Sequence, residues 1–162
     1  MSKQNKSGNK PIIITLIISA VLIATLVLTL AFADRISGSV SMYRLKKGIE
    51  GSDTLLISAP TYSDEFPVGA EKKIDGERAS ELISEIYDIA ENAKYDSVMN
   101  SEKGYWDTRL TFYRGNESCS LYLRENTVYI GNRNKAYVYK ISDSSISQYA
   151  ELLNQINNIL SE

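Results

Sequence analysis

Residues 105–141 have the sequence YWDTRLTFYRGNESCSLYLRENTVYIGNRNKAYVYKI. Apolar and polar side chains alternate along four runs, the pattern of half-buried β-strands: 105–114, 118–124, 127–130 and 136–141. Turn-forming residues separate the runs, at Gly115-Asn116, Glu125-Asn126 and 132–134. Because connections this short join antiparallel neighbours, the stretch predicts a four-stranded meander.

Two segments flank the meander, residues 77–93 and 144–160. In each, apolar residues recur at steps of three and four, which predicts an amphipathic helix. Asp75 is placed to cap the first helix, and Ser142 or Asp143 the second. Upstream, residues 54–58, 71–74 and 39–45 indicate further strands, whereas 61–69 and 95–104 indicate loops. A one-sided antiparallel sheet with two amphipathic helices predicts a two-layer α+β domain, both helices covering the apolar face.

The N-terminal part of the chain contains an uncharged apolar run from residue 12 to residue 33, preceded by Pro11. As a helix these 23 residues would extend roughly 34 Å, enough to cross a hydrocarbon core of about 30 Å. We therefore expect a cytoplasmic tail (1–10), a transmembrane helix (11–33), a stalk (34–52) and an extracytoplasmic α+β domain (53–162). Cleavage of the run as a signal peptide after Ala33 is the alternative.

Basic residues flank the apolar run on both sides, so the positive-inside count alone does not assign its orientation. Lys3, Lys6 and Lys10 precede it without any acidic residue, which favours an N-terminus inside the cell membrane and a C-terminal domain outside. The lipid bilayer is accordingly the first expected partner.

Composition excludes several functional classes. The chain has no His and one Cys, so it lacks the residues for a Ser-His-Asp triad, a His-ligated zinc site or an internal disulfide. Residues 34–162 contain 15 basic and 20 acidic residues, a net charge of −5, which argues against nucleic acid as a partner. Four carboxylates along the first helix (Glu81, Glu85, Asp88 and Glu91) fit a solvated face better than a metal site. We expect no cofactor, no metal and no enzymatic activity.

The polar side of the meander supplies the candidate site. Tyrosine offers a large contact area with few torsions to restrict, and arginine can bind carboxylates with two hydrogen bonds. The candidate ligand-binding residues are Arg109, Tyr113, Tyr122, Arg124 and Tyr129. The same residue types are also ordinary occupants of a half-exposed strand. Trp106 is a further candidate, either as a stacking platform or as a lid on one end of the core.

Several short pieces resemble a group of small membrane-anchored domains of unknown function from Gram-positive bacteria. They are 86–94 (with Asn92-Ala93-Lys94), Ser97-Val98, Tyr105, 110–113, Leu121-Tyr122-Leu123, Tyr129-Ile130 and 137–141, within a resemblance over about residues 54–160. The resemblance implies an extracytoplasmic location and supplies no activity and no functional residues. Many of these domains carry a lipid anchor, whose cysteine this chain lacks.

The sequence thus predicts a membrane-tethered, non-enzymatic binding module for a protein or cell-envelope partner. The alternative is an accessory or regulatory subunit of another membrane protein, acting partly through its transmembrane helix.

This topology predicts the outcome of protease treatment of intact cells expressing the chain with a C-terminal tag. The tag is expected to be removed, because the domain lies outside, while a cytoplasmic marker protein stays intact. Immunoblotting of the tag before and after treatment measures this. A tag shielded until the cells are lysed would contradict the outside placement.

Overall fold

The computed structural model describes residues 10–59, 70–100, 106–132 and 135–162. The chain is α+β, and it divides into two compact units, Met1–Ile36 and Ser37–Glu162. The expected loop at 61–69, the residue Tyr105 and most of the turn at 132–134 lie outside the described residues, as does the tail up to residue 9.

The first unit contains most of a long apolar helix, α1 (Lys10–Glu50). Its large apolar side chains between Ile12 and Ile36 are all exposed. The hydroxyls of Thr25 and Thr29 donate to backbone carbonyls one turn earlier, at 2.8 Å each, so they bring no unsatisfied polar group into this segment. Among the described residues, α1 is the one helix long and apolar enough to cross a membrane, a criterion that a signal sequence also meets.

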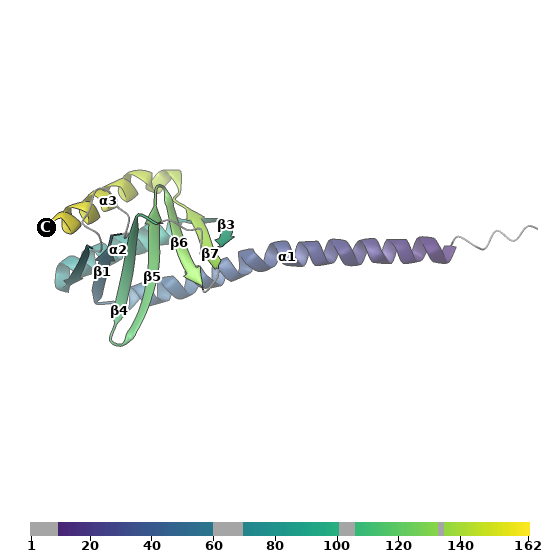
Figure 1. The fold of residues 1–162 in the computed structure, drawn as a ribbon, viewed down its shortest axis with the longest axis horizontal. Coiled ribbons are helices and arrows are strands. Elements are labelled where there is room, and N and C mark those ends of the chain that lie inside the picture. Colours follow the sequence, from purple (N-terminus) through teal and green to yellow (C-terminus); the bar gives the residue numbers. More distant parts are fainter. Residues whose placement is uncertain (1–9, 60–69, 101–105, 133–134) are drawn as a thin grey trace, which may run out of the picture. The chain divides into compact units, whose positions relative to one another are not determined.

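The second unit is built on one antiparallel sheet, with seven strands in the described residues. They are β1 (Thr54–Ser58), β2 (Glu71–Asp75), β3 (Lys94–Asn100), β4 (Thr108–Arg114), β5 (Glu117–Arg124), β6 (Thr127–Asn132) and β7 (Lys135–Lys140), in the order β2-β1-β4-β5-β6-β7-β3. The meander from β4 to β7 is confirmed, as are the strands expected at 54–58 and 71–74 (Figure 1).

The polar loop expected at 95–104 is wrong over its first part. Residues 94–100 form β3, which pairs with β7 at the edge of the sheet. The register shifts between Tyr95 and Ser97, so a bulge interrupts the period-two pattern. Tyr95 and Val98 consequently both lie against the core although three positions separate them.

The two expected helices are confirmed as α2 (Gly76–Asn92) and α3 (Ile146–Ser161). Asp75 occupies the N-cap position of α2. Before α3 the chain makes one turn of 3₁₀-helix, η2 (Asp143–Ser145), whose N-cap is Ser142. Ser145 then occupies the N-cap of α3 itself, so the start of this helix lies two residues later than expected.

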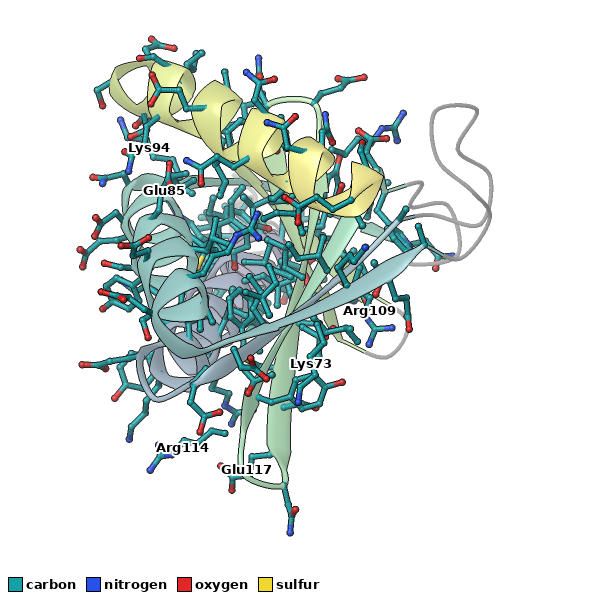
Figure 2. The ribbon with its side chains drawn as sticks, turned by 90° about the vertical axis from the view of Figure 1, so that its left-hand side faces the viewer. Lys73, Glu85, Lys94, Arg109, Arg114 and Glu117 are labelled. Atoms are coloured by element: carbon teal, nitrogen blue, oxygen red, sulfur yellow. The ribbon has the colours of Figure 1, made fainter. Side chains whose placement is uncertain are left out.

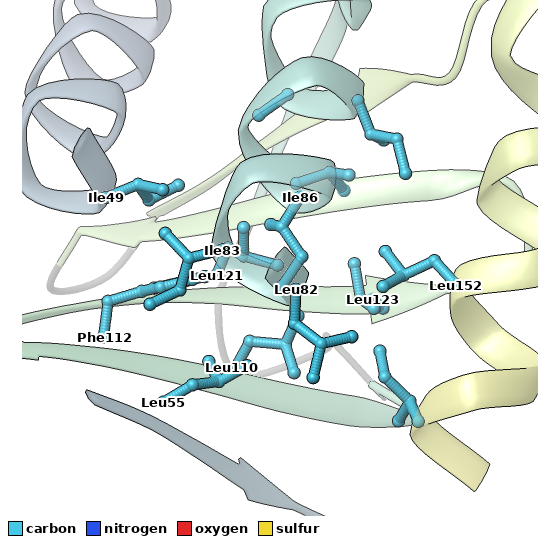
Figure 3. Close-up of a cluster of buried hydrophobic side chains, with 14 of the residues drawn as sticks. Ile49, Leu55, Leu82, Ile83, Ile86, Leu110, Phe112, Leu121, Leu123 and Leu152 are labelled. Carbon is cyan, nitrogen blue, oxygen red and sulfur yellow. The ribbon is translucent and has the colours of Figure 1, made fainter. Parts of the chain in front are cut away.

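The strand expected at 39–45 is also wrong, since these residues continue α1, as do most of those expected to form a stalk. Met42, Leu45 and Ile49 recur at helical spacing and belong to the same core as α2 and α3. Three helices rather than two therefore cover the apolar face of the sheet. Figure 3 shows Ile49 of α1, Ile86 of α2 and Leu152 of α3 gathered around Leu121 and Leu123 of β5.

Two glycines bring the end of α1 close to the sheet. A Cβ on Gly38 would lie 2.7 Å from the Tyr95 ring, and a Cβ on Gly48 would lie 2.6 Å from the Sγ of Cys119. The Tyr139 hydroxyl donates a 2.6 Å hydrogen bond to the carbonyl oxygen of Gly38. These contacts leave room for a hydrogen atom and not for a methyl group.

Because the backbone at Gly48 lies so close to Cys119, we expect Gly48→Ala to destabilise the fold, the opposite of its usual effect in a helix. In an unobstructed helix this change stabilises by about 1 kcal/mol. Here the new methyl group overlaps Sγ of Cys119, and overpacking costs about 1–3 kcal/mol. We expect net destabilisation in urea unfolding of the full chain in mild detergent, followed by fluorescence of Trp106, the single tryptophan.

The double variant Gly48→Ala, Cys119→Ala is expected to recover part of the loss, because the overlapping sulfur is gone. Ser37→Ala, at an exposed position of α1, is the control. A Gly48→Ala variant more stable than the parent chain would contradict the close packing.

Candidate functional site

The strands present a second face that points away from the core. Alternation along β4, β5 and β6 places the five candidate binding residues on this side, and we call them the tyrosine–arginine face: Arg109, Tyr113, Tyr122, Arg124 and Tyr129. Arg109 is exposed, and the other four are half-buried. Figure 2 shows Arg109 across the sheet from Glu85 of α2.

Strand register brings three of the five residues into one row. Arg109 of β4 pairs with Tyr122 of β5, and Tyr122 pairs with Tyr129 of β6. Directly opposed residues in adjacent strands have Cβ atoms about 5 Å apart, so their side chains form a continuous strip.

The other two residues lie further along the strands. Arg124 is two positions from Tyr122 on the same face and pairs with Thr127. Tyr113 is four positions from Arg109, or about 13 Å along the strand, where it pairs with Thr54 and Ser118. A ligand that contacts all five residues must therefore be extended.

Tyr122 is the centre of the row. The Arg109 guanidinium carbon lies 5.8 Å from the centroid of the Tyr122 ring, within the range of a cation–π contact. The Trp106 ring packs against the same tyrosine at 5.6 Å between centroids, with the planes tilted by 54°. Arg109 also donates to the Ser120 hydroxyl at 3.4 Å, and Ser120 shares a 3.0 Å hydrogen bond with Thr111.

Trp106 thus extends the tyrosine–arginine face and is no part of the core cluster. Strand alternation alone would have placed it on the core side, with Leu110 and Phe112. The alternation does not apply to Trp106, because β4 begins only at Thr108 and Trp106 lies before the regular strand. The contact with Tyr122 favours the role of a stacking platform for Trp106 over that of a lid on the core.

The chemistry of this face is that of a contact surface. It combines aromatic rings with guanidinium and hydroxyl donors, which bind by stacking and by hydrogen bonds to anionic or carbonyl oxygens. In the described part of the chain, no three His, Cys, Asp or Glu side chains are grouped to hold a metal ion. Two of the α2 carboxylates have protein partners, Glu85 with Gln155 at 3.3 Å and Glu91 with Lys46 at 3.6 Å.

Comparison of the chain with protein-family models, curated proteins and solved structures finds no match.

The one cysteine lies on the helix side of β5. Cys119 is partly buried against the core, with its thiol 4.0 Å from the carbonyl oxygen of Leu45. Burial raises the pKa of this thiol from about 9 to about 11. The neutral thiol is therefore the dominant form at physiological pH, which suits a packing role and opposes a nucleophilic one.

The raised pKa predicts slow alkylation of Cys119 in the folded chain. Two pKa units lower the thiolate fraction at pH 8 about hundredfold relative to an unstructured cysteine, and the reaction rate follows the thiolate fraction. Mass spectrometry of iodoacetamide labelling, with and without urea, measures the ratio. The folded rate is expected to keep rising up to about pH 11. Folded and unfolded rates within about twofold of each other at pH 8 would contradict this environment.

Proposed function

We propose that this chain is a single-pass membrane protein that binds a protein or cell-envelope partner through its tyrosine–arginine face. Residues 11–33 are the transmembrane helix, the N-terminus lies in the cytoplasm, and Ser37–Glu162 lies outside. The proposed role is non-enzymatic. The resemblance of short sequence pieces to small membrane-anchored domains of Gram-positive bacteria agrees with this location.

The membrane part of the proposal rests on the first unit. An uncharged apolar run with its side chains exposed is unfavourable in water and favourable in a bilayer, whose core matches its length. The apolar run also exceeds the length of about 7–15 residues typical of a cleaved signal sequence.

The binding part rests on one observation, the cluster in which Trp106 and Arg109 both contact the Tyr122 ring outside the core. Tryptophan, tyrosine and arginine are the residues that most often dominate binding energy at protein interfaces. The Ser120 contact and the Tyr122 ring restrict the Arg109 side chain, so less conformational entropy is lost when a ligand is bound.

A comparison of two matched triple variants tests this proposal. Arg109→Ala, Tyr122→Ala, Arg124→Ala removes the centre of the face, and Lys47→Ala, Tyr43→Ala, Arg78→Ala removes one tyrosine and two cations from exposed positions of α1 and α2, on the helix side of the sheet. Crosslinking in intact cells followed by quantitative mass spectrometry identifies the partner of the parent chain. We expect its capture to fall at least about tenfold for the first variant only, since hot-spot residues contribute about 2 kcal/mol or more each.

Exchange of residues 12–33 for an unrelated apolar span separates the proposal from the accessory-subunit alternative. A binding module retains its partner, because any span holds the domain at the membrane. Loss of capture on this exchange, together with normal capture by the first triple variant, would contradict the proposed role of the face.

A further inference from the structure

A groove of about 520 Å³ lies between the last turns of α1 and the β4–β5 hairpin, on the helix side of the sheet. Its floor is apolar, formed by Cys119 and the backbone of Gly48, with the buried Phe112 beneath them. The absence of a side chain at Gly48 brings the α1 backbone next to the Cys119 sulfur. The volume falls within the usual range of small-molecule sites, about 300–1,000 Å³.

Among the described residues, three cationic side chains and one acidic side chain line this groove. Arg44 and Lys47 come from α1 and Arg114 from the end of β4, while Glu117 begins β5. All four are exposed at the rim, and Figure 2 shows Arg114 and Glu117 together at the end of the hairpin. The lining has two positive charges in excess, although the chain as a whole has a net charge of −2.

Arg114 lies beside the end of α1. A Cβ on Gly51 would lie 2.7 Å from Nη1 of Arg114, so the guanidinium lies directly against the backbone at this glycine and next to the groove.

Compensation of the α1 helix dipole accounts for Lys47, which lies in the last turn, but not for Arg44 or Arg114. Two of the carbonyls at the end of α1 have donors from Ser52, which donates its hydroxyl to Gly48 at 2.6 Å and its N–H to Ile49 at 3.0 Å. The dipole effect also falls off within the last turn, and Arg44 lies a turn and a half before Glu50.

We propose that this groove binds a small molecule made of a phosphate monoester and an apolar body. The dianionic phosphate matches the two excess charges and accepts hydrogen bonds from Arg44, Lys47 and Arg114. The apolar body lies on the floor formed by Cys119 and Gly48. The site is separate from the tyrosine–arginine face, so either can fail without the other.

Phenyl phosphate is the probe, because it carries both parts and is water-soluble. The full chain, labelled with ¹⁵N at its 9 glycines and held in lipid nanodiscs, is titrated to about 10 mM and followed by NMR. We expect saturable shifts of the Gly48 and Gly51 amides, whereas Gly131, beside Tyr122 on the other face, stays unmoved. Alkylation of Cys119 is expected to slow over the same concentration range, since the probe covers its sulfur.

Related probes test each part of the ligand. Phenyltrimethylammonium is expected to shift neither glycine, and inorganic phosphate to bind about tenfold more weakly than phenyl phosphate. Equal binding of the cationic probe would overturn the charge recognition, and equal binding of inorganic phosphate would overturn the apolar subsite. Absence of any shift with phenyl phosphate would overturn the site.

Charge-removing variants complete the test. Arg44→Gln, Arg114→Gln is expected to raise the half-saturating phenyl phosphate concentration about tenfold or more, whereas Lys73→Gln, Lys94→Gln, at exposed positions outside the groove, leaves it unchanged. An equal loss of phenyl phosphate affinity in both variants would show that binding depends only on the net charge of the chain, and it would overturn the site.

Discussion

Close packing of the end of α1 on the sheet is the contact on which the second unit depends. At Gly38 and Gly48 the helix backbone approaches the sheet side chains with no intervening side chain of its own. This approach allows Met42, Leu45 and Ile49 to reach the common core and allows Tyr139 to satisfy its buried hydroxyl on a helix carbonyl. Burial raises the pKa of Tyr139 strongly, so the bonded hydroxyl stays neutral. The edge strand β3 depends on the same contact, because Tyr95 packs edge-on against Tyr139 at 5.9 Å beside Gly38.

The sequence predicted the parts of this fold whose hydrophobic period is regular. The sequence of β4 to β6 alternates between apolar and polar side chains, and short connections join the four strands of the meander, although four buried residues follow one another in β7. Helices α2 and α3 each carry one clear apolar stripe. Residues 37–50 were misassigned because glycine and serine usually indicate a loop, whereas here Gly38 serves close packing. Strand β3 was missed because its bulge replaces the two-residue period by a three-residue step.

The candidate site was predictable in composition but not in arrangement. The alternation of apolar and polar residues shows which side chains lie on the polar face of the meander. Which of them pair across neighbouring strands depends on the geometry of the turns. The turn after β5 places Glu125 in the left-handed region, at φ 49°, and this tight connection sets Tyr122 opposite Tyr129. The contribution of Trp106 depends on where β4 begins, and single-sequence patterns locate strand ends poorly.

The tyrosine–arginine face and the groove place their cationic side chains in different surroundings, and this difference favours different ligands. On the tyrosine–arginine face, Arg109 lies over an aromatic ring within a half-buried strip, an arrangement that suits a broad contact with little net field. In the groove, three cations surround an apolar floor within a chain whose residues 34–162 are net negative. At physiological salt, charges further away than about 8 Å are largely screened, so the positive field is confined to the groove itself. An acidic domain of this kind repels extended polyanions at long range and can still hold a compact anion at one point.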